Sequence, residues 1–186
     1  MNIMTPPDNA SSLPVTDVEK KAQSNRDFLE FGSAYAREHG TRTATIGLVL
    51  ASSPLALLSW IGEKYLEWTD KDPSLESILD SVTLYFLTDT FSRCIYPYRE
   101  NFGPKRDPEA SKPKSKAFNA GTKPMGFSWF PFELIPMPKS WTEQSTDNLV
   151  FYKSHERGGH FAALEGPQVL WGDVEEFAAK AWKTQG

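Results

Sequence analysis

A carboxylate and a histidine in the second half of the chain could together carry out acid–base chemistry. Glu133 stands in the segment Phe130-Pro-Phe-Glu-Leu134, and His160 follows 27 residues later in Gly158-Gly-His-Phe-Ala-Ala-Leu-Glu165. A carboxylate held against an imidazole orients the ring and stabilises its charged form, so that the ring can take a proton from water. The order of acid and then histidine matches the end of a hydrolytic triad, which needs a nucleophile earlier in the chain.

Two predicted strands position these side chains. Gly126–Phe130 has the composition of a short strand that Pro131 stops, and Leu149–Lys153 has that of a buried strand. Loops at the carboxyl ends of adjacent parallel strands meet at one edge of a sheet, so we expect Glu133 and His160 to lie close together. The alternative is that Glu133 is a solvated acid and His160 a loop histidine without a catalytic role.

Helices are predicted for most of the remaining chain. A capping box at Thr16-Asp-Val-Glu19 predicts a helix that runs to about His39, with Gly40 as its C-terminal stop. The segment Thr45–Trp68 is divided at Pro54, and the part after the proline is predicted to be helical, because its apolar residues recur at helical spacing: Leu55, Leu58, Ile61, Tyr65 and Trp68.

Two more helices and one loop complete the prediction. Ser74 is expected to cap a helix that ends before Arg93, with Leu75, Ile78, Leu79, Val82, Tyr85 and Phe86 facing a core. Lysine, proline, serine and glycine dominate Phe102–Thr122, which is typical of a mobile surface loop. Pro167 suits the first turn of a last helix that runs to about Trp182, with Val169, Leu170, Val174, Phe177 and Trp182 on its apolar side.

The order of the elements predicts the fold class. Helices fill the first half, and the second half alternates strand, loop, strand, loop and helix, which is typical of the edge of an α/β sheet. Two strands and one helix do not form an independent sheet, so this segment is expected to belong to a larger one.

Composition excludes several classes of function. The 186 residues carry a net charge of −4, which does not favour a nucleic-acid partner. Cys94 is the only cysteine, so disulfides within the chain are excluded. Its side chain is either a reactive thiol or a small buried hydrophobe. No cysteine, histidine and carboxylate cluster supports a metal site at His155 and His160.

Met1–Pro14 lacks the apolar core of a secretory signal, and the apolar run Ala44–Ile61 is too broken to span a bilayer, so a cytoplasmic protein is expected.

Five segments together resemble the microsomal-type epoxide hydrolases of the α/β-hydrolase fold. They are the two segments around Glu133 and His160 and, in matching order, Tyr35-Ala-Arg-Glu-His-Gly-Thr-Arg, Ser53-Pro-Leu-Ala-Leu-Leu-Ser-Trp-Ile-Gly-Glu-Lys and Ile95-Tyr-Pro-Tyr-Arg-Glu-Asn. The resemblance implies a partial α/β fold with a helical cap region at 1–101, a flexible loop at 102–125 and a C-terminal α/β-hydrolase segment at 126–186.

The resemblance also implies a mechanism and the residues that perform it. In this family an aspartate opens the epoxide to form a glycol ester, two cap tyrosines hold the epoxide oxygen, and a histidine–carboxylate pair activates water to hydrolyse the ester. Tyr35 and Tyr98 match the tyrosines, Glu133 the carboxylate and His160 the base. The implied ligand is a small-molecule epoxide, and no cofactor is implied.

Two other features of the family, the nucleophile turn and the oxyanion motif, are not found in this sequence. Only Asp8, Asp17 and Asp27 precede Tyr35, and none has the flanking glycines of a nucleophile turn. The oxyanion motif is also absent, because His39-Gly40 is better explained as a helix end. We therefore expect either that a partner chain or a longer gene product supplies the nucleophile, or that the chain is an inactive truncated homologue. An inactive homologue would be a binding or regulatory partner of a full-length hydrolase, or a gene fragment without function. Relatives act in detoxification and in secondary metabolism, and the residues do not favour either.

Overall fold

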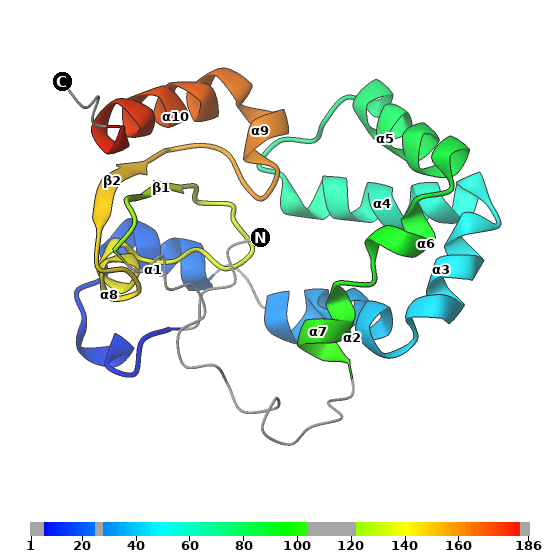
Figure 1. Cartoon of the computed structure of the whole chain (residues 1–186), viewed down its shortest axis with the longest axis horizontal. Helices are drawn as coiled ribbons and strands as arrows, with labels where there is room; N and C mark the ends of the chain where they lie inside the picture. Colours follow the sequence, from blue (N-terminus) through cyan, green and yellow to red (C-terminus); the bar gives the residue numbers. More distant parts are fainter. Residues whose placement is uncertain (1–5, 25–27, 104–121, 183–186) are drawn as a thin grey trace. The chain divides into compact units, whose positions relative to one another are not determined.

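A computed structural model of the chain describes residues 6–24, 28–103 and 122–182 (Figure 1). The chain divides into two compact units, each with a hydrophobic core of its own. Unit 1 comprises Met1–Arg26, Trp68–Lys71 and Lys114–Gly186, and unit 2 comprises Asp27–Glu67 and Asp72–Pro113. Unit 1 is thus assembled from three separate stretches of the sequence.

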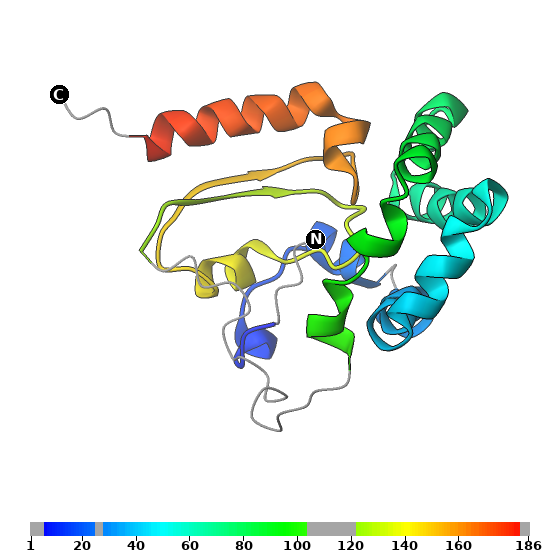
Figure 2. The ribbon, with the colours of Figure 1, turned by 45° about the vertical axis from the view of Figure 1, so that its right-hand side comes forward.

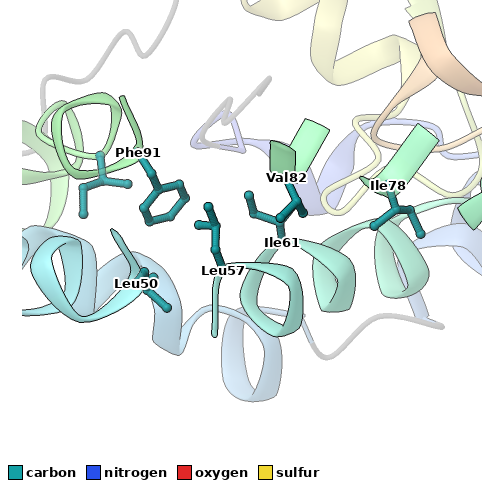
Figure 3. Packing of buried hydrophobic residues seen from close by; sticks show 7 residues of the cluster. Leu50, Leu57, Ile61, Ile78, Val82 and Phe91 are labelled. Carbon is teal, nitrogen blue, oxygen red and sulfur yellow. The ribbon is translucent and has the colours of Figure 1, made fainter. Parts of the chain in front are cut away.

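Unit 2 is helical in the part of it that the structure describes. Its elements are the π-helix η2 (Phe28–Gly32), α2 (Ala34–Thr41), α3 (Thr43–Ala51), α4 (Pro54–Trp68, whose last residue belongs to unit 1), α5 (Leu75–Thr88), α6 (Phe91–Cys94) and α7 (Tyr98–Phe102). Residues four apart on α4, Leu57 and Ile61, and on α5, Ile78 and Val82, lie on one side of each helix and are buried. Together with Leu50, Phe91 and Ile95 they form the core of this unit (Figure 3).

Unit 1 contains a parallel pair of strands between helices. Its elements are η1 (Ala10–Ser12), α1 (Asp17–Ser24), β1 (Met125–Trp129), α8 (Lys139–Gln144), β2 (Leu149–Ser154), α9 (Ala162–Glu165) and α10 (Pro167–Ala181). β1 and β2 pair in parallel, from Met125 opposite Leu149 to Trp129 opposite Ser154. Helix α10 covers one face of the pair, and α1 and α8 lie on the other (Figures 1 and 2). Met125, Phe127 and Trp129 alternate along β1 into the core that they share with Ala22 and Met137.

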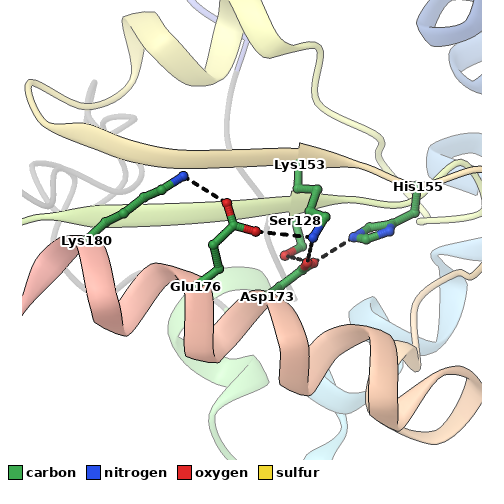
Figure 4. A network of polar contacts seen from close by, with 6 residues as sticks. All are labelled: Ser128, Lys153, His155, Asp173, Glu176 and Lys180. Carbon is green, nitrogen blue, oxygen red and sulfur yellow. Dashed lines mark hydrogen bonds and ion pairs between the residues drawn. The ribbon is translucent and has the colours of Figure 1, made fainter.

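A polar network attaches α10 to both strands (Figure 4). Asp173 is only 2% exposed; it accepts a hydrogen bond from the Ser128 hydroxyl of β1 at 2.7 Å and contacts His155 Nε2 at 2.6 Å. The ammonium of Lys153 on β2 lies 3.3 Å from Asp173 and 3.2 Å from Glu176. Burial alone would raise the pKa of Asp173, but the hydrogen bonds from Ser128 and His155 outweigh it and hold this pKa below its ordinary value.

Most of the predicted helix starts and strands are confirmed. The Thr16 amide donates to Glu19 Oε2 at 2.8 Å and the Glu19 amide donates to Thr16 Oγ1 at 3.3 Å, which is a complete capping box. The division at Pro54, the cap at Ser74, the two strands and the helix that begins at Pro167 also agree with the sequence prediction. The loop predicted for 102–122 lies almost wholly outside the described residues.

The first helix was predicted too long. Instead of one helix to His39, α1 ends at Ser24, and a π-helical turn precedes α2. The helix α2 also continues through Gly40 to Thr41. Gly40 serves packing rather than termination, because a Cβ there would lie 2.7 Å from the Cβ of Phe102 in α7.

Apolar spacing also assigned some exposed side chains to cores. Leu75 and Trp182 are 67% and 81% exposed, and Leu79, Val169 and Val174 are each more than two-fifths exposed. Leu75 and Trp182 stand at or just beyond a helix end, where little surrounds them. The short helices α6, α7, α8 and α9 were not predicted, because four to six residues give too short a pattern to detect.

Among the helices of the described residues, none is by itself long and apolar enough to cross a bilayer. Only α3 and α4 taken together meet the length and hydropathy of a span, and the chain bends by 114° between them.

Candidate active site

The strand pair brings Glu133 and His160 together. Glu133 follows β1 and His160 follows β2, and a parallel bridge between Phe132 and Gly159 continues the pairing beyond the strands. Glu133 Oε1 lies 2.5 Å from His160 Nδ1. The side chain of His160 is 11% exposed and that of Glu133 is 24% exposed, so both are largely removed from water.

The electrostatics of this pair fix the role of each ring nitrogen. Burial alone would raise the pKa of Glu133, but the hydrogen bond and the charge of His160, with a hydrogen bond from the Leu134 amide at 2.7 Å, lower it below its ordinary value. The ionised carboxylate can only accept, so the imidazole donates its Nδ1 proton. The lone pair that can take a proton is then on Nε2, which is the arrangement of a general base.

A cavity of about 330 Å³ in unit 1 reaches both groups. Glu133, His160 and Phe130 line it. Asp173 and Phe177 of α10 also line it, as do residues of β1 and β2. The dyad therefore borders a space with aromatic and carboxylate walls, large enough for a small organic group.

Tyr35 and Tyr98 form a second pair in unit 2. Tyr35 on α2 and Tyr98 on α7 have ring centroids 5.7 Å apart and an interplanar angle of 74°. Burial, the charge of Tyr98 and a hydrogen bond between the two side chains raise the pKa of Tyr35; burial also raises the pKa of Tyr98, although the hydrogen bond with Tyr35 opposes this. Both phenols therefore hold their protons at neutral pH and can donate them.

A buried histidine, His39, packs against the tyrosine pair. The ring of His39 lies edge-on to Tyr98 at 4.8 Å and to Tyr35 at 5.6 Å, and it is 4% exposed. His39 Nε2 accepts a hydrogen bond from the Trp60 indole at 3.1 Å. Burial first, and then the charge of Lys64, lower the pKa of His39 to about 4, so this ring is neutral beside the tyrosines.

Comparison with solved structures finds similar proteins among the epoxide hydrolases. The structure of Aspergillus niger epoxide hydrolase matches with a TM-score of 0.81 and 42% identity over 98% of this chain and 45% of that one. The chain is homologous to the epoxide hydrolases. Its fold is therefore part of an α/β-hydrolase fold, and its described residues are mostly helical with a small sheet.

Comparison with curated proteins finds similarity to the same kind of enzyme. A Dothistroma septosporum protein provisionally assigned as an epoxide hydrolase is 48% identical over 98% of this chain and 42% of its own length. Epoxide hydrolase 1 of the pig, Sus scrofa, is 31% identical over 78% of this chain and 34% of its own length. No protein-family profile matches the chain. The chain spans less than half the length of these epoxide hydrolases.

Two further features of this epoxide hydrolase homologue were not predicted from its sequence. One is the aromatic and histidine packing behind Tyr35 and Tyr98. The other is the pair of carboxylates, Asp70 and Glu165, that contact the backbone around His160. Glu165 lies within the segment that carried the resemblance, but nothing in its spacing indicated what it binds. Within the described residues no three histidine, cysteine or carboxylate side chains gather as a metal site would require.

Proposed function

We propose that this chain carries the water-activating dyad and the oxygen-binding tyrosines of an epoxide hydrolase. With a nucleophilic carboxylate it would convert a small-molecule epoxide and water into a vicinal diol. The observation that most supports the proposal is the 2.5 Å contact between Glu133 and His160 in a chain homologous to epoxide hydrolases.

The first step opens the ring. A carboxylate oxygen bonds to one epoxide carbon, the bond from that carbon to the epoxide oxygen breaks, and a tyrosine hydroxyl gives its proton to the alkoxide that forms. An alkoxide is far more basic than a phenolate, so the proton transfer is favourable even though burial raises the pKa of both phenols. The neutral state of Tyr35 and Tyr98 is consistent with this role.

The second step cleaves the resulting ester. His160 Nε2 takes a proton from water as the water oxygen adds to the ester carbonyl, and Glu133 stabilises the imidazolium that forms. The glycol oxygen then leaves as the diol, protons return to the diol and the tyrosine, and the carboxylate is regenerated. The activation of water in this step uses His160 and Glu133, both of unit 1.

We propose that the nucleophile comes from a partner chain or from a longer protein product. None of the aspartates before Tyr35 has the glycine neighbours of a nucleophile turn. The coverage of less than half of each relative is consistent with a nucleophile outside these residues.

A chimera tests the function directly. The part of the Dothistroma protein that precedes the matched region would be joined to this chain, and diol formation from styrene oxide would be measured. We expect turnover, and in His160→Ala we expect a covalent glycol ester to accumulate, visible as an added mass. Ester formation in this variant does not require the base, but hydrolysis does.

Matched controls distinguish chemistry from damage. Glu156→Gln, on an exposed residue of the same loop, and Tyr96→Phe, near Tyr98, should retain turnover. Tyr35→Phe combined with Tyr98→Phe should slow ester formation instead of its hydrolysis. A folded chimera that neither turns over nor forms an ester would reject the proposal and favour a binding or regulatory homologue.

A further inference from the structure

Four consecutive backbone amides around His160 are bound by residues outside that segment. The Gly158 amide donates to Asp70 Oδ2 at 3.1 Å, the Gly159 amide to Glu165 Oε2 at 3.0 Å, the His160 amide to the Trp68 carbonyl at 3.0 Å and the Phe161 amide to Glu165 Oε2 at 3.2 Å. The backbone of this segment is therefore held at every residue.

The Glu165 carboxylate also binds the backbone of Asp70. Glu165 Oε1 accepts a hydrogen bond from the backbone amide of Asp70 at 2.6 Å, while its other oxygen accepts the two loop amides. The side chain of Asp70 is 8% exposed, and its Oδ2 also accepts from Arg157 Nε at 2.5 Å. Hydrogen bonds to charged acceptors are about twice as strong as neutral ones, so this arrangement is rigid.

Close packing leaves the loop little freedom. A Cβ on Gly159 would lie 2.8 Å from the Trp68 carbonyl oxygen and 2.9 Å from that of Phe132, so only glycine fits. Gly158 has a φ of 101°, a conformation that favours glycine. The Trp68 ring stands edge-on to the His160 ring at 5.3 Å. The direction of the imidazole is thus set by both its backbone and its neighbours.

We propose that Asp70 and Glu165 are positioning residues for His160. They fix the loop backbone so that Nδ1 meets Glu133 and Nε2 stays available as the base. Glu165 contributes more to holding the loop, because it accepts hydrogen bonds from three backbone amides. Asp70 accepts hydrogen bonds from one backbone amide and from the Arg157 side chain. The catalytic meaning of this role rests on the proposed function of His160.

Nuclear magnetic resonance of the full chain tests the proposal without turnover. Glu165→Gln has one acceptor oxygen in place of two, so it cannot hold Asp70 and the loop at once. We expect amide exchange at Gly159 and Phe161 to become at least about tenfold faster. The hydrogen-bonded Nδ1 proton of His160, assigned by its absence in His160→Gln, should broaden or move upfield. Glu175→Gln, on an exposed residue of α10, should change neither.

The outcomes separate positioning from general stability. If Glu165→Gln is folded and exchanges faster but keeps the wild-type Nδ1 proton, the carboxylate only stabilises the loop and the proposal is overturned. If Glu165→Gln does not fold, Asp70→Asn gives the same readout at the Gly158 amide. An Nδ1 proton that depends on Glu165, in a chimera without ester hydrolysis, would support positioning and count against the proposed function.

Discussion

Glu133 is held ionised beside His160, and its charge is the property that the proposed chemistry needs. In the chimera, Glu133→Gln keeps the size of the side chain but cannot stabilise the imidazolium. We expect ester hydrolysis to slow by roughly 10²- to 10⁴-fold, the range of general base catalysis, with ester formation almost unchanged. Rapid quench of a single turnover measures the two steps separately. Equal slowing of both steps would contradict a role confined to water activation.

Protonation of the buried His39 should make the free energy of unfolding depend on pH. Its pKa of about 4 in the folded state lies below the ordinary value of 6.5. Between these values the unfolded chain binds the proton more readily, so the free energy of unfolding falls as pH drops from about 6.5 to 4, by about 3 kcal/mol at most. His39→Gln, which does not titrate, should remove this part of the pH dependence.

Urea unfolding at pH 7 and pH 4.5 measures the effect of His39. Ile95→Val is the matched control. It leaves a methyl-sized void in the core of unit 2 and should lower the free energy of unfolding equally at both pH values. Identical pH dependence in wild type and His39→Gln would show that the ring is charged or exposed.

At the scale of elements, Asp173 holds α10 to the strand pair. Because the folded state lowers its pKa, this carboxylate contributes stability above its unfolded pKa of about 3.9, and the contribution is lost as pH falls through the lower folded value. Asp173→Asn should cost roughly 1.5–3 kcal/mol at pH 7 and flatten the acid limb of the stability curve. Denaturant unfolding from pH 7 to 2.5 tests this, with Glu175→Gln as the control.

The elements also show which parts of the structure a sequence can predict. The capping box, the cap at Ser74 and the break at Pro54 depend on neighbouring residues, and each is confirmed. The meeting of Glu133 and His160 was predictable because parallel strands bring their ends to one edge. The partnership of Asp70 and Glu165 joins residues 95 apart, and no local pattern indicates it. Tyr35 and Tyr98 were selected by the family resemblance alone.

At the scale of the whole molecule, the proposal predicts that the purified chain alone forms no diol from styrene oxide above the buffer rate. Without a nucleophile there is no ester for the dyad to hydrolyse. Gas chromatography of the product measures this directly. Diol formation that disappears in His160→Ala would show that a carboxylate of this chain acts as the nucleophile, and would contradict an external source.

The four residues Trp68–Lys71 belong to unit 1 although the chain on both sides of them belongs to unit 2. The ordered backbone around His160 therefore depends on contacts that close loops of 87 to 95 residues. Closing such long loops costs entropy and slows folding, so these contacts should form late, after the local helices. A synthetic peptide of residues 122–182 would contain Glu133 and His160. It would still lack Trp68–Lys71, the segment that holds the backbone around His160.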